Sequence, residues 1–167
     1  MSGAVVWITG RPQSGKSTLA QAARDALRER GVACCVLDSD AVRDATVPAR
    51  GYSDADRDAH YATLGRLAAA LARQDLIVLV PATAHLRRYR AAAREIAPAF
   101  VEVYIDAPPE TCAERDEKGL YTGGATALPG RDVAYEPPED ADVVATGGCD
   151  AAAVERIVAA AMSARRE

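Results

Sequence analysis

A glycine-rich loop near the start of this 167-residue chain constrains its fold more than any other sequence feature. Residues 10–17 read GRPQSGKS and match the pattern G-x-x-x-x-G-K-[ST] in full. The apolar run Val5–Ile8 before them predicts a buried strand, and a helix is predicted from about Lys16 to just before Gly31. A strand, this loop and a helix in that order are typical of phosphate-binding loops, in which backbone N–H groups at a helix N-terminus surround phosphate oxygens.

Lys16 and Ser17 give this loop its chemistry. The Lys16 ammonium can reach the β and γ phosphates of ATP, and the Ser17 hydroxyl can bind Mg²⁺. The sequence has lysine only at Lys16 and Lys118, whereas its other eighteen basic residues are arginine. A glycine-rich turn that holds lysine and serine by chance is disfavoured by the flanking strand and helix. We therefore expect ATP and Mg²⁺ as cofactors, with ATP contacts at Gly10, Arg11, Pro12, Gln13, Ser14, Gly15, Lys16, Ser17 and Thr18.

Apolar runs alternate with helical segments along the rest of the chain. Short, continuously apolar strands between helices indicate a parallel sheet covered on both faces, the three-layer α/β fold of P-loop kinases. No repeat or linker divides residues 1–167, so we expect one domain, with a mobile glycine- and proline-rich loop at 122–140. Strands are predicted at 32–38, 76–80, 100–106 and 142–145, and helices at 54–73, 85–96, from 108 onward and at the C-terminus.

Two carboxylates follow the second predicted strand. A phosphate-binding loop needs a further acid for Mg²⁺ or its waters, and the strand 76–80 ends in Pro81 without one. We therefore expect Asp38 to join Ser17 in the metal shell and Asp40 to orient an acceptor hydroxyl as general base. A helix N-cap at Ser39 or Asp40 is a second interpretation, compatible with the first. Since the carboxyl ends of parallel strands meet at one edge, one rim is expected to hold Gly10, Asp38, Asp40, residues 81–85 and Asp106.

Charge and composition argue against some partners. A formal net charge of −4 and a sequence pI near 5.3 argue against nonspecific binding to nucleic acid. The N-terminal apolar run is too short for a membrane span or a signal peptide, so we expect a cytoplasmic protein without a membrane partner. The four cysteines show no C-x-x-C spacing, and the adjacent Cys34 and Cys35 are expected to be reduced packing residues.

Longer motifs cover nearly all of the chain. They are W-I-T-G at 7–10, L-D-S-D at 37–40 with Arg43, G-Y-S at 51–53 with Arg57, R-D-E-K-G-L-Y at 115–121 and Y-E-P-P at 135–138. Together these segments closely resemble adenylyl-sulfate (APS) kinases, and the segment at 115–121 is more specific than the phosphate loop. The resemblance implies that residues of about 112–140 form a lid and the loop after it, with Arg115 and Lys118 closing over ATP.

The resemblance also implies a reaction, the transfer of the γ-phosphoryl group of ATP to the 3′-hydroxyl of APS. The product would be the activated sulfate donor PAPS, as in sulfate assimilation. Lys16, Asp40 and Arg43 would be catalytic, with Asp40 orienting the acceptor hydroxyl. Arg43 and Arg57 would hold the phosphosulfate of the acceptor. A homodimer is compatible with this interpretation.

The chain departs from the family pattern where the acceptor would bind. Ser39 replaces glycine in L-D-G-D, and in D-R-x-x-N-x-x-R His60 replaces asparagine and Thr63 replaces the second arginine. Residues 83–85 read T-A-H where the family has I-S-P. Leu128 replaces the phenylalanine of F-T-G, whose ring would stack on the acceptor's adenine. The predicted acceptor-binding residues are Asp40, Arg43, Arg57, His60, Thr83, His85 and Leu128.

Both histidines of the chain, His60 and His85, fall at these altered positions. Their imidazoles could bind an anionic acceptor with an affinity that rises below about pH 6.5, or they could be surface or capping residues. Two alternatives to APS phosphorylation stay open: phosphorylation of another anionic, hydroxyl-bearing small molecule or nucleotide, and a nucleotide-binding regulator without phosphotransfer. The chain contains no asparagine, which excludes the N-K-x-D guanine signature and disfavours the regulator.

Overall fold

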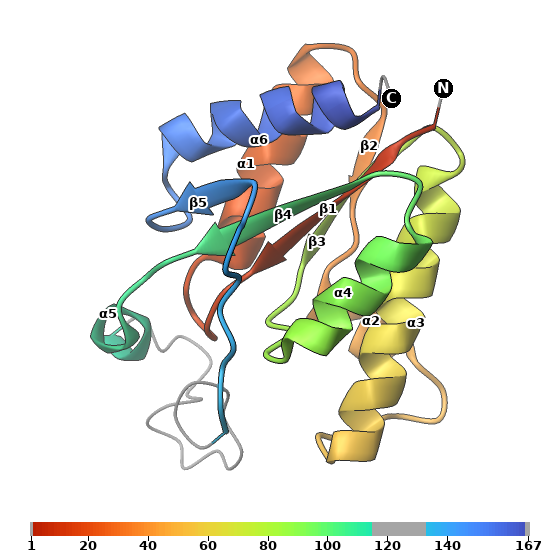
Figure 1. Ribbon diagram of the computed structural model, residues 1–167, viewed down its shortest axis with the longest axis vertical. Coiled ribbons are helices and arrows are strands. Elements are labelled where there is room, and N and C mark those ends of the chain that lie inside the picture. Colours follow the sequence, from red (N-terminus) through yellow and green to blue (C-terminus); the bar gives the residue numbers. More distant parts are fainter. Residues whose placement is uncertain (1, 115–132, 166–167) are drawn as a thin grey trace.

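The computed structural model describes residues 2–114 and 133–165. The predicted site residues Arg115, Lys118 and Leu128 lie outside the described residues. In the described part, a parallel sheet lies between two layers of helices (Figure 1). This arrangement confirms the three-layer α/β fold that the alternating apolar runs predict.

The strands of the sheet are β1 Ala4–Thr9, β2 Cys34–Val36, β3 Ile77–Pro81, β4 Phe100–Ile105 and β5 Val143–Ala145. They are all parallel, in the order β2-β3-β1-β4-β5. β1 lies at the centre, where Val5 is opposite Val78 on one side and Phe100 on the other. Every residue of β1 and β3 is buried because helices cover both faces, which explains why these strands read as continuous apolar runs.

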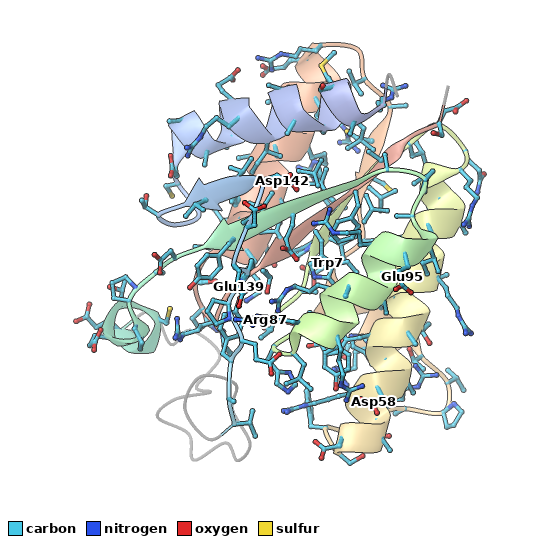
Figure 2. All side chains as sticks on the ribbon, in the orientation of Figure 1. Trp7, Asp58, Arg87, Glu95, Glu139 and Asp142 are labelled. Carbon is cyan, nitrogen blue, oxygen red and sulfur yellow. The ribbon has the colours of Figure 1, made fainter. Side chains whose placement is uncertain are left out.

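The helices are α1 Lys16–Glu29, α2 Ser39–Ala45, α3 Asp54–Ala72, α4 Arg87–Ile96, α5 Pro109–Glu114 and α6 Ala151–Ala164. Successive residues of β1 point to opposite faces and so to different helices. Ile8 packs in one buried cluster with Leu19 of α1 and Ile157 of α6. Trp7, labelled in Figure 2, is fully buried in the other cluster with Leu64 of α3. Because all the described strands are parallel, their carboxyl ends share one edge of the sheet, as predicted.

The second strand and its following turn differ from the prediction. The strand ends at Val36, and a helix, α2, begins at Ser39, close to where the second interpretation of this segment places a helix N-cap. Its N-cap is Asp38 rather than Ser39 or Asp40: the Asp38 backbone is extended, and its Oδ1 accepts a hydrogen bond from Asp40 N–H at 2.9 Å. A carboxylate at this position satisfies one of the free N–H groups of the first turn, so the helix can begin directly after it.

Residues 133–140, part of the segment predicted to be a mobile loop, form contacts with the core. Glu136 N–H donates a hydrogen bond to the carbonyl oxygen of His85 at 2.8 Å. Arg87, the first residue of α4, forms an ion pair with Glu139 at 2.8 Å (Figure 2). These contacts hold the segment against the residues that follow β3.

Cys34 and Cys35 pack within the sheet, as predicted. All four cysteines are free, and Cys34 and Cys35 are half-buried in β2, where burial raises the pKa of both thiols. Among the described helices, none combines the length and the apolar character needed to cross a membrane.

Candidate active site

The loop between β1 and α1 folds around its own lysine. Lys16 Nζ donates hydrogen bonds to the carbonyl oxygens of Gly10 and Arg11, at 3.0 and 2.8 Å. Gly15 has a φ of +101°, a left-handed conformation that residues with a side chain rarely adopt. A Cβ at Gly10 would lie 2.6 Å from Ser14 Oγ. Both glycines of the motif are therefore needed in the turn that leads into α1: Gly15 for its left-handed backbone and Gly10 for its close approach to Ser14.

The predicted metal-binding pair comes together in the structure. Ser17 Oγ donates a hydrogen bond to Asp38 Oδ2 at 2.8 Å, while Oδ1 of the same carboxylate caps α2. The capping bond fixes the orientation of the carboxylate and leaves its second oxygen directed at the start of α1. Asp40 is exposed in the first turn of α2, so the two acids lie together beyond the end of β2.

Two buried arginines lie under an exposed aromatic ring. Arg43 of α2 is 8% exposed and Arg57 of α3 is 5% exposed, whereas Tyr52 is 61% exposed. The guanidinium carbon of Arg43 lies 4.4 Å from the centroid of the Tyr52 ring, and that of Arg57 lies 5.9 Å from it. Arg43 Nη1 also donates to the carbonyl oxygen of Gly51 at 2.7 Å. This arrangement offers positive charge and an open aromatic face at one place.

Ser39 and His60, two of the departures from the family pattern, contact each other. Ser39 Oγ lies 2.8 Å from His60 Nε2, and both side chains are buried. Burial, followed by the charges of Arg43 and Arg50, lowers the pKa of His60 to about 4. The imidazole is therefore neutral at neutral pH. It is neither a surface residue nor a group that gains charge just below pH 6.5, and both of those expectations are wrong for His60.

Thr63, a third departure, also has a partner. Arg50 Nη1 donates a hydrogen bond to Thr63 Oγ1 at 2.8 Å, and the Thr63 hydroxyl donates to the carbonyl oxygen of Ala59 at 2.9 Å. Where the family pattern has an arginine on α3, this chain therefore has a threonine with an arginine from a neighbouring loop beside it.

The residues after β3 are held by the rim of the sheet. Thr9 Oγ1 donates to the carbonyl oxygen of Thr83 at 2.6 Å and lies 2.8 Å from Tyr135 Oη, whose pKa burial raises. His85 is buried, its ring packs edge-on to Tyr89 at 5.6 Å, and burial lowers the pKa of His85 to about 4. His85 is therefore not a surface residue and does not gain charge just below pH 6.5, so these two expectations are wrong for it as well.

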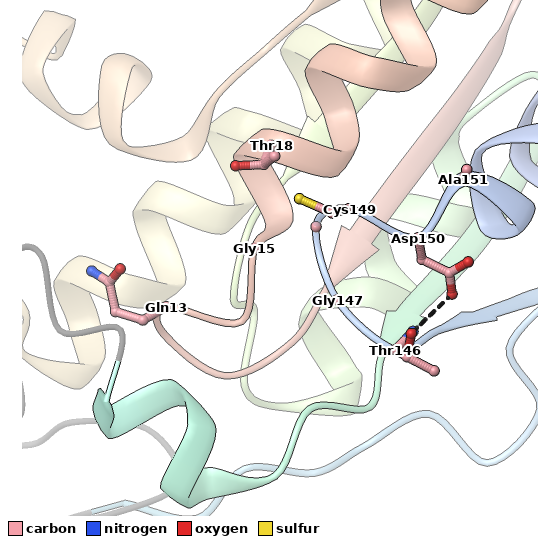
Figure 3. Close-up of a pocket in the computed structure, with 9 residues that line it drawn as sticks. Gln13, Gly15, Thr18, Thr146, Gly147, Cys149, Asp150 and Ala151 are labelled. Carbon is pink, nitrogen blue, oxygen red and sulfur yellow. Dashed lines mark hydrogen bonds between the residues drawn. The ribbon is translucent and has the colours of Figure 1, made fainter.

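A pocket of about 620 Å³ lies between the phosphate loop and the turn from β5 to α6 (Figure 3). A Cβ at Gly148 would lie 2.8 Å from the carbonyl oxygen of Gly15 and 2.9 Å from Thr18 Cβ, so the turn packs directly on the loop. The Asp150 carboxylate accepts hydrogen bonds from Thr146 N–H and Ala153 N–H, both at 3.0 Å, which fixes the turn and caps α6. The lining residues are Gln13, Gly15, Thr18, Thr146, Gly147, Gly148, Cys149, Asp150 and Ala151.

Comparison with known proteins places this site in a family. A family model described as adenylylsulphate kinase matches residues 2–146. The chain belongs to the adenylyl-sulfate kinase family. An adenylyl-sulfate kinase of Synechococcus sp. (strain JA-2-3B'a(2-13)) is 40% identical over 146 residues, which cover 85% of this chain and 83% of that relative. One from Rippkaea orientalis is 39% identical over 145 residues, covering 84% and 80% of the two chains.

Solved structures agree with this assignment. The Mycobacterium tuberculosis APS kinase in complex with AMPPNP and APS is 36% identical, with a TM-score of 0.83, and the match covers 93% of this chain and 94% of that one. The motif-based resemblance to APS kinases is thus confirmed, and so is the expectation of an ATP-dependent kinase with a P-loop fold. Among the described residues, the acceptor-side departures Ser39, His60 and Thr63 have hydrogen-bond partners within the chain.

Two groups of site residues were not identified from the sequence. The first is the pocket turn 146–151, whose only signal is a pair of glycines after a short strand. The second is Tyr52 with Arg50. The G-Y-S motif contains Tyr52 and directly follows Arg50, but it indicates no contact for either residue.

Proposed function

We propose that this chain transfers the γ-phosphoryl group of ATP to the 3′-hydroxyl of APS, with PAPS and ADP as products. The observation that carries the proposal is the position of Arg43 and Arg57, buried under the exposed ring of Tyr52. Buried guanidinium groups favour an anionic acceptor, and an open aromatic face favours a planar base. APS combines a phosphosulfate with adenine and so matches both features.

ATP would lie along the phosphate loop and in the neighbouring pocket. Backbone N–H groups of residues 10–18 other than Pro12, together with the N-terminus of α1, would hold the phosphates, and the Lys16 ammonium would move to the β and γ phosphates. The nucleoside would then extend past Thr18 into the pocket formed by the turn 146–151. Arg115 and Lys118 would close over it from the lid.

Mg²⁺ would bind at Ser17 and Asp38. The ion usually keeps several waters and takes only one or two protein oxygens together with substrate phosphates. Ser17 Oγ and Asp38 Oδ2 are already 2.8 Å apart at the edge of the phosphate loop, and both are hard oxygen ligands of the kind that Mg²⁺ prefers. Bound there, the ion would neutralise charge on the β and γ phosphates during transfer.

The acceptor would lie on the α2 and α3 side of the loop. Arg43 and Arg57 would bind its phosphosulfate, and the ring of Tyr52 would stack on its adenine in the absence of an aromatic residue at Leu128. Asp40 would accept the proton of the 3′-hydroxyl while the hydroxyl oxygen attacks the γ phosphorus and ADP leaves. His60, Thr83 and His85 would shape the site rather than carry charge.

Coupled ADP release from the purified protein tests this function. ATP, Mg²⁺ and micromolar APS should give ADP at a rate that depends on APS, and mass spectrometry should detect PAPS. Turnover with another anionic nucleotide or phosphorylated alcohol but not with APS would favour the alternative acceptor. ATP binding without turnover on any acceptor would favour a regulator.

Assembly and location are separate parts of the proposal. A homodimer in the cytoplasm is proposed, working in sulfate assimilation. One similar solved structure is described as a hexameric APS kinase from Thiobacillus denitrificans, 25% identical over 97% of this chain and 29% of that one, with a TM-score of 0.69. Size-exclusion chromatography with light scattering would show whether this chain assembles at all.

A further inference from the structure

The segment between α2 and α3 carries an arginine that the proposed reaction does not use. Arg50 is half-buried, and within the described residues it forms no ion pair. Its one hydrogen bond there, of 2.8 Å, goes to the neutral hydroxyl of Thr63. A guanidinium group has five N–H donors, so Arg50 retains donors and a full charge for a further partner.

Arg50 belongs to the same cluster as the two acceptor-side arginines. The next residue, Gly51, accepts the 2.7 Å hydrogen bond from Arg43 Nη1, and Tyr52 covers Arg43. Arg50 contacts Thr63, three residues after His60 on α3, and His60 contacts Ser39 of α2, the helix that carries Arg43. The loop segment therefore brings a second arginine to the place where Arg43 already lies.

The spacing along α3 shows where Arg50 adds its charge. Arg57, His60 and Thr63 follow each other at intervals of three residues, so they lie on one side of the helix. Arg57 supplies a cation at the first position and His60 is neutral at the second. At the third position the threonine carries no charge, and the guanidinium of Arg50 lies against it instead.

We propose that Arg50 is an acceptor-binding residue, which brings from the loop the cation that the family pattern places on α3. It would give the site a third guanidinium beside Arg43 and Arg57 and so favour an acceptor with a multiply charged anionic group, such as a phosphosulfate. This inference rests on the proposed function, because it names a residue of the same acceptor site.

Steady-state kinetics of two matched variants test the inference. Arg50→Gln should raise the KM for APS about tenfold or more, since a hydrogen bond to a charged group is lost, and should leave the KM for ATP within twofold. Arg66→Gln removes the same charge from an exposed position of α3 and should leave both KM values unchanged. The double variant Arg50→Gln/Thr63→Arg should recover most of the lost affinity for APS, because it returns the cation to α3.

The results separate this inference from the proposed function. Suppose that the wild-type protein turns over APS and that the Arg50→Gln and Arg66→Gln variants have the same KM for APS. Arg50 then only supports the loop, and the inference is wrong. A double variant whose KM stays as high as that of Arg50→Gln would also count against it.

A binding measurement decides the role of Arg50 if the wild-type protein does not turn over APS. Inorganic pyrophosphate is titrated calorimetrically into the complex with ADP and Mg²⁺, so that the phosphate loop is already occupied. Weaker binding to Arg50→Gln than to Arg66→Gln supports an anion site at Arg50, although the proposed function has then failed. Equal binding overturns the inference.

Discussion

Lys16 has its ammonium group over the phosphate loop, where the carbonyl oxygens of Gly10 and Arg11 hold it. Lys16→Ala removes the cation that would stabilise charge on the transferred phosphoryl group, and we expect kcat/KM to fall by roughly 10²-fold or more. The fold should persist, because Lys16 belongs to neither of the two buried clusters that form the core of the described residues. ADP release and the circular dichroism spectrum measure the two effects, and wild-type turnover in the variant would remove Lys16 from the mechanism.

A matched pair of variants can distinguish the role of Asp40 from that of Asp44, the other acid of α2. Asp40→Asn should lower kcat by roughly 10²-fold or more, as expected for loss of a general base, and should change the KM for ATP little. Asp44→Asn makes the same change one turn further along α2, at another exposed position, and should be nearly neutral. Similar kcat values for the two variants would show that Asp40 is not the base.

Site residues were predictable where a sequence motif indicates the chemistry of each residue. Ser17 and Asp38 were predicted as a pair, and the structure places their oxygens 2.8 Å apart. The contact between Ser39 and His60 was not predictable, since the sequence alone presents each residue as a loss from the family pattern and no motif links the two. Such pairs depend on how α2 and α3 pack, which spacing along one helix does not give.

The turn between β5 and α6 shows how one element positions another. Its Gly148 packs against the carbonyl oxygen of Gly15, so Gly148→Ala would place a methyl group 2.8 Å from that backbone atom. The turn and the phosphate loop must then move apart. We expect the KM for ATP to rise about tenfold, because both elements line the same pocket. Titration with a fluorescent ATP analogue measures the affinity directly.

Gly31 provides the control for the glycine substitution. It has a φ of +69°, and a Cβ added there would have no other atom within 4 Å, so Gly31→Ala is strained in its backbone but does not clash. We expect a loss of stability of about 1 kcal/mol without a change in the KM for ATP. Equal affinities for ATP in the two variants would argue that the pocket is not the nucleotide site.

Elements were predictable from the sequence when they were long and periodic. The strands β1 and β3 and the helices α1 and α3 lie within a few residues of their predicted bounds, because buried runs and caps such as Ser53 mark them clearly. The extent of α2 was not predicted, although an N-cap near its start was considered, since its seven residues are too few to show a helical period. The attachment of residues 133–140 was not predictable either, because glycine and proline content says nothing about distant hydrogen-bond partners.

At the scale of the whole molecule, the two buried histidines link stability to pH. The pKa values of His60 and His85 are lowered to about 4 in the folded protein, whereas in the unfolded chain they are near 6.5. The unfolded state therefore binds more protons between these values, and the free energy of unfolding falls as the pH decreases from about 6.5 to about 4. We expect a loss on the order of 1 kcal/mol per pH unit for each histidine, measured by urea denaturation.

Between pH 6.5 and pH 5 this loss can be assigned to the histidines. Asp58 and Asp150 have lowered pKa values, so they stay ionised in the folded protein and contribute their own loss of stability only at lower pH. His60→Gln should remove roughly half of the slope in this range. An unchanged slope in that variant would mean that His60 is protonated in the folded state.

Phosphorylation of APS at its 3′-hydroxyl can be checked by identifying the product of the wild-type enzyme. APS and its 3′-deoxy analogue are each incubated with ATP and Mg²⁺, and ³¹P NMR follows the transferred group. Our account predicts a new 3′-phosphate resonance and equimolar ADP with APS, and neither with the analogue. Phosphorylation of the 3′-deoxy compound at another position, or no transfer to APS while a different anionic acceptor is phosphorylated, would contradict it.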